Sequence, residues 1–216
     1  PDQTTALARI NAAYQQAAQF LARAEVLLLT LGTAVVSEHA ETGQVVANNH
    51  KMPAQTFRQR RLSVEETTSA LATALSPWLE ARADRRAILT VSPVRHWRLG
   101  AVENQRSKAT LVLACADLCE RLPRTTYFPA YELLLDDLRD YRFYAQDMVH
   151  PSETAEDYIW SHFGAAYFSE NTQQLNAQLA KLQAALQHRP FHPNTPAHQM
   201  FLRQQLAAVE ALERVH

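Results

Sequence analysis

The amino-acid sequence predicts an α/β domain built on a parallel sheet. Three short apolar runs, residues 25–31, 87–91 and 125–128, each end at a turn residue. Runs of this kind are typical of strands that a parallel sheet buries on both faces. Helical patterns lie between the runs, which indicates right-handed β-α-β crossovers.

The helical segments follow from capping signals and periodicity. Ser63 and Glu66 form a capping box that opens a helix to about Ala83, and residues 107–121 keep apolar side chains on one face. Residues 5–23 form a first helix, which we interpret as the crossover from a strand that precedes this chain. Residues 35–46, with Gly43 near the tip, are expected to form a hairpin or excursion after the first strand.

The pattern becomes wholly helical after residue 150. Residues 152–168, 171–187 and 197–214 are predicted helices, and a proline-rich connector precedes the last of them. We therefore expect an α/β part over residues 1–168 and a helical extension over residues 169–216 that packs on the same domain.

Charge and cysteine content exclude several classes of protein. The chain has 216 residues, with 21 Lys and Arg against 22 Asp and Glu, so it has no net field for nucleic acid or an anionic membrane. No apolar run reaches the ~20 residues of a membrane span, and the expected location is cytoplasmic. Cys115 and Cys119 share one face of a helix and are expected to be reduced core thiols.

The strongest chemical signal is the pair formed by Asp147 and His150. A carboxylate three residues before an imidazole can fix the tautomer of the ring and stabilise its protonated form. His150 is therefore a candidate general base. The alternative is that Asp147 only caps a helix and His150 is incidental.

Polar residues follow all three predicted strands. Because ligands bind beyond the carboxyl ends of the strands in open α/β sheets, these residues are candidates for substrate binding. The alternatives are a tight turn at Gly32 and a solvated loop around Arg95. The candidates are Gly32, Thr33, Ser92, Arg95, His96, Tyr131 and Glu132.

Amide and imidazole side chains add candidates for binding an oxyanion. Asn48 and His50 lie in a predicted loop, where Asn side chains either stabilise a developing oxyanion or simply make a turn. Asn104, Ser107 and Lys108 stand near the start of a predicted helix, where they either bind an anion or cap the helix.

The order of these motifs resembles that of bacterial GSCFA-domain proteins. The resemblance covers about Glu25 to Phe201, and its most specific part is residues 127–151. The segments that carry it are Leu31–Ala34, Ala47–Lys51, Thr90–His96, Asn104 with Ser107 and Lys108, Tyr127–Glu132, Asp137–Tyr144 and Asp147–Pro151.

Membership of that family implies a relation to SGNH or GDSL-type hydrolases, with a flavodoxin-like three-layer α/β/α fold and a final Asp-x-x-His-Pro motif. Asp147, His150 and Pro151 match this motif. The resemblance also implies a Ser nucleophile in a Gly-Ser-Cys-Phe-Ala motif, which this sequence lacks and which would precede Pro1. The usual oxyanion Asn is absent after Gly32, so Asn48 or His50 is the hypothetical substitute.

Three functions are compatible with these residues. The leading hypothesis is a Ser-dependent hydrolase of acyl or acetyl esters, with a small-molecule or carbohydrate ester as substrate and no cofactor. The second is a non-catalytic binding or interaction module that keeps the pocket. The third is a metal-dependent hydrolase whose ligands are His50, His96, Asp147 and His150. An N-terminal fragment of the same protein or a second copy of the chain is the expected protein partner.

Overall fold

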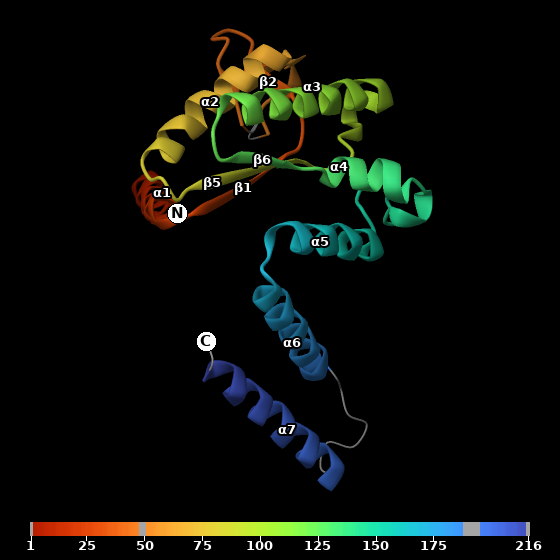
Figure 1. The fold of residues 1–216 in the computed structure, drawn as a ribbon. Helices are drawn as coiled ribbons and strands as arrows, with labels where there is room; N and C mark the ends of the chain where they lie inside the picture. Colours follow the sequence, from red (N-terminus) through yellow and green to blue (C-terminus); the bar gives the residue numbers. More distant parts are fainter. Residues whose placement is uncertain (1, 48–50, 188–194, 215–216) are drawn as a thin grey trace. The chain divides into compact units, whose positions relative to one another are not determined.

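The computed structural model describes residues 2–47, 51–187 and 195–214. The chain divides into two compact units, the first ending at Ile159 and the second beginning at Trp160. Each unit is described by itself below, with the element labels of Figure 1.

A parallel sheet of three strands forms the centre of the first unit. The strands lie in the order β1 (Val26–Leu31), β5 (Arg86–Val91) and β6 (Thr125–Phe128), and both neighbouring pairs are parallel. The central strand β5 is buried along its length except at its first residue. This confirms the predicted α/β class with a parallel sheet and is consistent with a three-layer α/β/α arrangement.

Two helices cover one face of this sheet (Figure 1). Helix α2 (Val64–Glu80) begins at the predicted capping box, in which Ser63 and Glu66 satisfy each other's backbone N–H groups. Helix α3 (Gly100–Arg121) starts seven residues before the predicted Ser107. The core between helices and sheet contains Leu75, Leu79, Ala87, Leu89, Val91, Leu111, Cys115 and Leu118.

A small antiparallel sheet follows β1. Its central strand β2 (Val35–His39) pairs with β3 (Val45–Val46), which confirms the predicted hairpin, and with β4 (Phe57–Arg61). The sequence did not predict β4, because its arginines give no apolar alternation. Its position depends on pairing with β2 and on ion pairs, such as the Arg60 Nε to Glu38 contact of 2.7 Å.

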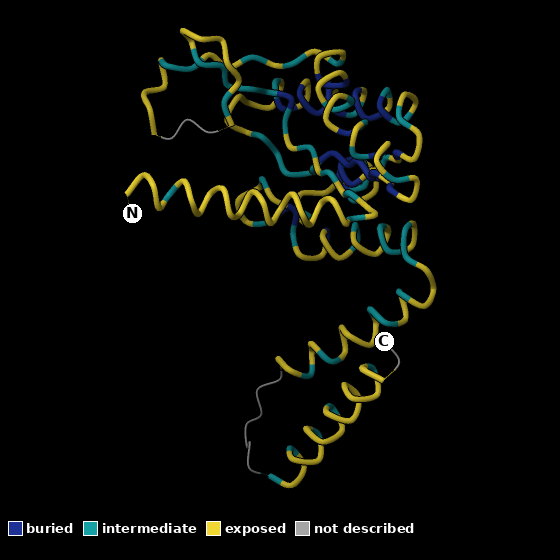
Figure 2. Tube along the Cα trace, turned by 90° about the vertical axis from the view of Figure 1, so that its left-hand side faces the viewer, coloured by how far each residue is buried: buried dark blue, intermediate teal, exposed yellow. Residues whose placement is uncertain are grey.

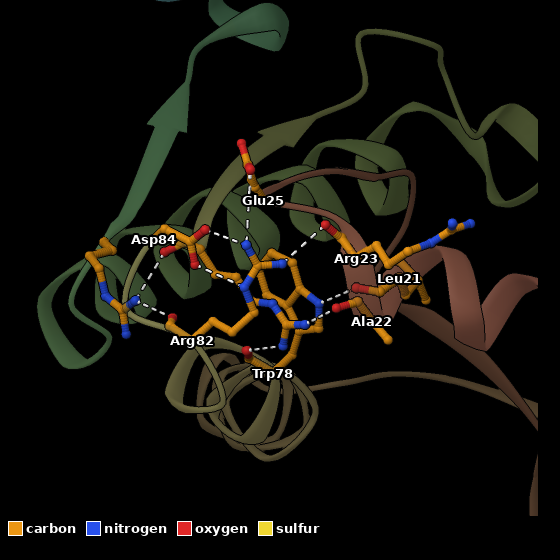
Figure 3. Close-up of polar contacts among 9 residues, drawn as sticks. Leu21, Ala22, Arg23, Glu25, Trp78, Arg82 and Asp84 are labelled. Atoms are coloured by element: carbon orange, nitrogen blue, oxygen red, sulfur yellow. Dashed lines mark hydrogen bonds and ion pairs between the residues drawn. The ribbon is translucent and has the colours of Figure 1, made fainter.

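Helix α1 (Gln3–Arg23) belongs to the first unit and is hydrogen-bonded to the rest of it at its C-terminal end. It has no buried residue, and Figure 2 shows it exposed along its length. Carbonyl groups of a last helical turn need donors from outside the helix. Side chains at the end of α2 and in the turn after it supply them (Figure 3): Trp78 donates to Leu21, Arg85 to Ala22 and Arg82 to Arg23.

Short helical segments connect the sheet to the rest of the first unit. They are η1 (Ala54–Thr56), η2 (Trp97–Leu99), α4 (Ala130–Glu132), η3 (Leu133–Leu138) and η4 (Tyr141–Phe143). A second small core of Leu134, Tyr144 and Ala155 lies beyond β6.

The second unit is helical, as predicted. It contains the end of α5 (Glu153–Tyr167), α6 (Glu170–Gln187) and α7 (Pro196–Glu213). Among the helices of the described residues, none combines the length and the apolar character needed to cross a bilayer.

Candidate active site

Asp147 and His150 form a hydrogen-bonded pair on the surface of the first unit. The Oδ2 atom of Asp147 lies 2.6 Å from Nδ1 of His150, and Oδ1 accepts the backbone N–H groups of Val149 and His150 at 2.9 and 3.0 Å. Hydrogen bonds from the His150 backbone, then from its ring and from the Val149 backbone, lower the pKa of Asp147 to about 2. The carboxylate is therefore ionised at neutral pH and fixes the imidazole through Nδ1.

The other ring nitrogen of His150 is available for chemistry. No residue within 2–47, 51–187 or 195–214 is hydrogen-bonded to Nε2 of His150, and about 60% of the side chain is exposed. A ring held at Nδ1 and open at Nε2 has the arrangement of a general base that awaits its proton donor.

The loop that carries the pair is fastened beyond the carboxyl end of β5. Arg95 lies four residues after that strand. Its backbone N–H donates to the Val149 carbonyl at 3.1 Å, and its side-chain Nη1 donates to the Met148 carbonyl at 3.0 Å. These two carbonyls belong to the residues between Asp147 and His150. The loop is closed on itself because Ala145 donates to the His150 carbonyl at 2.8 Å. Arg95 thus links the loop of Asp147 and His150 to the segment that follows β5.

A buried lysine joins the ends of two strands. Lys108 is fully buried, and its Nζ donates to the carbonyl oxygens of Gly32 at 2.7 Å and Ser92 at 2.6 Å. Burial lowers the pKa of Lys108 from 10.5 to about 8, so the side chain is still an ammonium group at neutral pH. Lys108 therefore fixes the ends of β1 and β5 against each other.

Ser107 completes this link one residue earlier on α3. Its hydroxyl accepts the backbone N–H of Ala34 at 2.7 Å and lies 3.0 Å from the hydroxyl of Thr33. Because α3 begins at Gly100, Ser107 and Lys108 lie two turns inside the helix. Of the two alternatives, that they bind an anion at the helix start or cap it, neither fits residues at this depth in the helix.

A pocket of about 190 Å³ includes Arg95, which also contacts the loop of the pair. Arg95 and Tyr144 belong both to this pocket and to the contacts of the loop. The lining residues are Pro93, Arg95, Trp97, Ala101, Asn104, Gln105, Tyr131, Leu135 and Tyr144.

Three of the residues predicted to bind substrate line this pocket, namely Arg95, Asn104 and Tyr131. His96 does not line the pocket, but its backbone N–H donates to Oδ1 of Asn104 at 2.7 Å and so fixes the side chain of that lining residue. Asn48 and His50 lie outside the described residues.

The remaining predicted residues make contacts within the fold. Thr33 accepts the backbone N–H of Val35 at 3.1 Å, and the Ser92 hydroxyl accepts that of Val94 at 3.2 Å. The carboxylate of Glu132 accepts the hydroxyl of Tyr127 at 2.9 Å. Gly32 contributes the carbonyl that binds Lys108.

Sequence reasoning missed the structural importance of Lys108 and the pocket positions of Trp97, Gln105 and Tyr144. A signal for Lys108 exists, because it stands on the same helical stripe as Leu111, Cys115 and Leu118. A lysine in line with core residues indicates a buried partner. The three lining residues carry no comparable signal, because surface aromatic and amide residues are common.

A metal-binding cluster is not visible in the part of the chain that the structure describes. Within it, no three or more His, Cys, Asp or Glu side chains are grouped so that they could hold an ion. His50, one of the four ligands of the metal hypothesis, lies outside the described residues.

Comparison with known proteins identifies the family. The model of the GSCFA family matches residues 1–163, and that of the GSCFA domain protein, C-terminal domain, matches residues 168–216. No curated protein and no solved structure matches the chain. Since the first match covers most of the sequence, the chain belongs to the GSCFA family.

Proposed function

We propose that this chain supplies the acid–base pair of a Ser-dependent ester hydrolase related to the SGNH or GDSL-type enzymes. The observation that carries the proposal is the 2.6 Å contact between Asp147 Oδ2 and His150 Nδ1, together with the open Nε2. The division into an α/β part, residues 1–168, and a helical extension, residues 169–216, belongs to the same proposal.

In this mechanism the Ser hydroxyl comes from a segment N-terminal to the chain. His150 takes the hydroxyl proton on Nε2 as the Ser oxygen attacks the ester carbonyl carbon, and then gives the proton to the departing alkoxide. Water hydrolyses the acyl-enzyme in the same way, with His150 as base. Asp147 stays ionised and stabilises the imidazolium that forms in each step.

The binding roles remain hypotheses from the sequence. Asn48 or His50 is the proposed oxyanion donor, and Arg95, Asn104 and Tyr131 are the proposed contacts to an acyl or acetyl ester of a small molecule or carbohydrate. The exposed position of the pair is compatible with a nucleophile that approaches from another segment.

The test is labelling of the complete natural polypeptide with a fluorophosphonate probe. We expect labelling of one Ser, a loss of at least 100-fold in labelling rate for His150→Ala and Asp147→Asn, and an unchanged rate for His162→Ala in α5. Equal labelling of His150→Ala and the natural protein would overturn the mechanism.

A non-catalytic binding module is the second candidate, and the observation that favours it is the pocket beside Arg95. The same experiment separates the two. Absence of any labelled Ser in the complete polypeptide, combined with ligand binding in the pocket, would favour the module over the enzyme.

A further inference from the structure

The pocket beside Arg95 offers hydrogen-bond donors to a ligand and few acceptors. Asn104, which lines it, is only 7% exposed. The Oδ1 atom of Asn104 accepts the backbone N–H of His96 at 2.7 Å. A backbone N–H can only donate, so this contact fixes the orientation of the amide and leaves the Nδ2 donor group without a partner among the described residues.

Gln105 and Tyr131 repeat this arrangement on the next wall of the pocket. The Tyr131 hydroxyl donates to Oε1 of Gln105 at 2.9 Å, which uses the amide oxygen and leaves the Nε2 donors of Gln105 free of described partners. Burial raises the pKa of Tyr131, so its hydroxyl stays neutral.

Arg95 adds a positively charged guanidinium group, most of whose N–H donors have no hydrogen-bond partner among the described residues. Its guanidinium carbon lies 3.9 Å from the ring centre of Tyr144 and 5.3 Å from that of Trp97, so aromatic rings contact its faces. Of the five N–H donors of an arginine side chain, the described residues accept one, at the Met148 carbonyl. The remaining N–H donors of the guanidinium can therefore bind a ligand.

We propose that this pocket binds a carboxylate group of the ligand. A carboxylate accepts hydrogen bonds through two oxygens and donates none, so it matches the free donors of Asn104, Gln105 and Arg95. None of the lining residues is acidic. An amide or alcohol would bring donor groups for which these walls have few free acceptors.

The volume of the pocket and the electrostatic field at the start of α3 both suit a carboxylate. The pocket volume of about 190 Å³ equals that of roughly six water molecules at about 30 Å³ each, which accommodates a carboxylate on a short carbon stem. The first turn of α3 contributes Ala101 to the wall, and the N-terminal end of a helix favours negative charge.

This proposal extends the proposed function. It rests on that function only where it assigns the carboxylate to an ester substrate. Arg95 holds the loop of Asp147 and His150 and also lines the pocket. An ester that carries a free carboxylate, such as a half-ester of a short dicarboxylic acid, would therefore be bound next to the acid–base pair.

The test measures binding of succinate to the complete polypeptide through the fluorescence of Trp97, with succinamide as the neutral analogue. The decisive variant is Gln105→Glu, which keeps an acceptor for the Tyr131 hydroxyl but places a negative charge on the wall. Gln105 is exposed, so the fold should tolerate the change, and circular dichroism checks this. The matched control is Ala109→Glu, the same change of charge at an exposed position one turn further along α3.

We expect saturable binding of succinate, at least tenfold weaker binding of succinamide and of succinate to Gln105→Glu, and a change below twofold in Ala109→Glu. The fluorescence response should vanish in Trp97→Phe. The proposal is overturned if succinate does not bind, if Gln105→Glu binds it as well as the natural protein, if phosphate binds more tightly, or if the response persists without Trp97.

This measurement requires no turnover. Failure of succinate to bind would leave the fluorophosphonate result intact, and failure of the fluorophosphonate to label a Ser would leave the carboxylate pocket intact. The two proposals can therefore fail separately.

Discussion

The ammonium group of Lys108 donates to the carbonyl oxygen of Gly32 over 2.7 Å, although the two residues are 76 positions apart. Its second acceptor is the carbonyl of Ser92. Each of these carbonyls lies one residue beyond a strand end, and the buried ammonium supplies it with a hydrogen-bond donor. Lys108 therefore ties together the segments that directly follow β1 and β5, where the candidate site begins.

Replacement of Lys108 by Met should destabilise the first unit by about 2–4 kcal/mol, because two backbone carbonyls would lose the charged donor that now binds them. Urea unfolding followed by tryptophan fluorescence measures this cost. The exposed Lys181 of α6 provides the control, and Lys181→Met should change the free energy of unfolding by less than about 0.5 kcal/mol. Equal effects of the two substitutions would show that the buried ammonium is dispensable.

The carboxyl group of Asp147 should titrate far below its ordinary pKa of 3.8, near 2, because backbone and ring donors bind its ionised form. A lowered carboxyl pKa stabilises the folded loop above pH 3.8, and this contribution is lost as the pH falls through about 2. Carbon-13 NMR of the Asp147 carboxyl gives the midpoint directly. In His150→Ala the midpoint should move up towards 3.8, and an unchanged midpoint would mean that the ring contributes nothing.

Removal of the Arg95 side chain should loosen the loop that carries Asp147 and His150. Arg95→Ala loses the hydrogen bond to the Met148 carbonyl and the contact with the Tyr144 ring, but keeps the backbone bond to Val149. Hydrogen exchange at the Ala145 amide, which donates to the His150 carbonyl, should become at least tenfold faster.

The control for this measurement is Arg98→Ala, at an exposed position in η2 that does not line the pocket. Exchange at Ala145 should be unchanged in that variant. Unaltered exchange in Arg95→Ala would show that the loop holds its own conformation.

Arg85 should be the main residue that holds the C-terminal end of α1 against the rest of the first unit. Its side chain is only 5% exposed and donates to the Ala22 and Trp78 carbonyls, so Arg85→Met should cost about 2–4 kcal/mol. Arg82→Met removes a more exposed arginine from the same group of contacts (Figure 3) and should cost about 1 kcal/mol or less. Far-UV circular dichroism during urea unfolding compares the two variants, and the reverse order would contradict the assignment.

The positions of the three parallel strands and the main helices could be predicted from the sequence, because apolar runs and capping residues act locally. The hairpin of β2 and β3 also follows from local signals, with Gly43 at a positive φ of 67° in the turn. Strand β4 could not be predicted in this way, since its partners β2 and Glu38 lie about twenty residues away.

The hydrogen-bonded pair of Asp147 and His150 illustrates the same limit. The spacing of Asp147 and His150 predicted their hydrogen bond, because three residues suffice to bring the two groups together in a tight loop. The attachment of this loop to Arg95 joins segments 53 residues apart, and periodicity contains no information about such a contact.

The sequence by itself determined the class of fold, the family and the candidate pair of Asp147 and His150, because these depend on local pattern and on residue type. Only the tertiary structure decided that Lys108 is buried beneath the strand ends and that Arg95, Asn104 and Gln105 share one pocket. The physical reason is that burial and the direction of free donors are set when distant segments pack together. The sequence gives the chemical type of each side chain, and the tertiary structure determines which groups that side chain contacts.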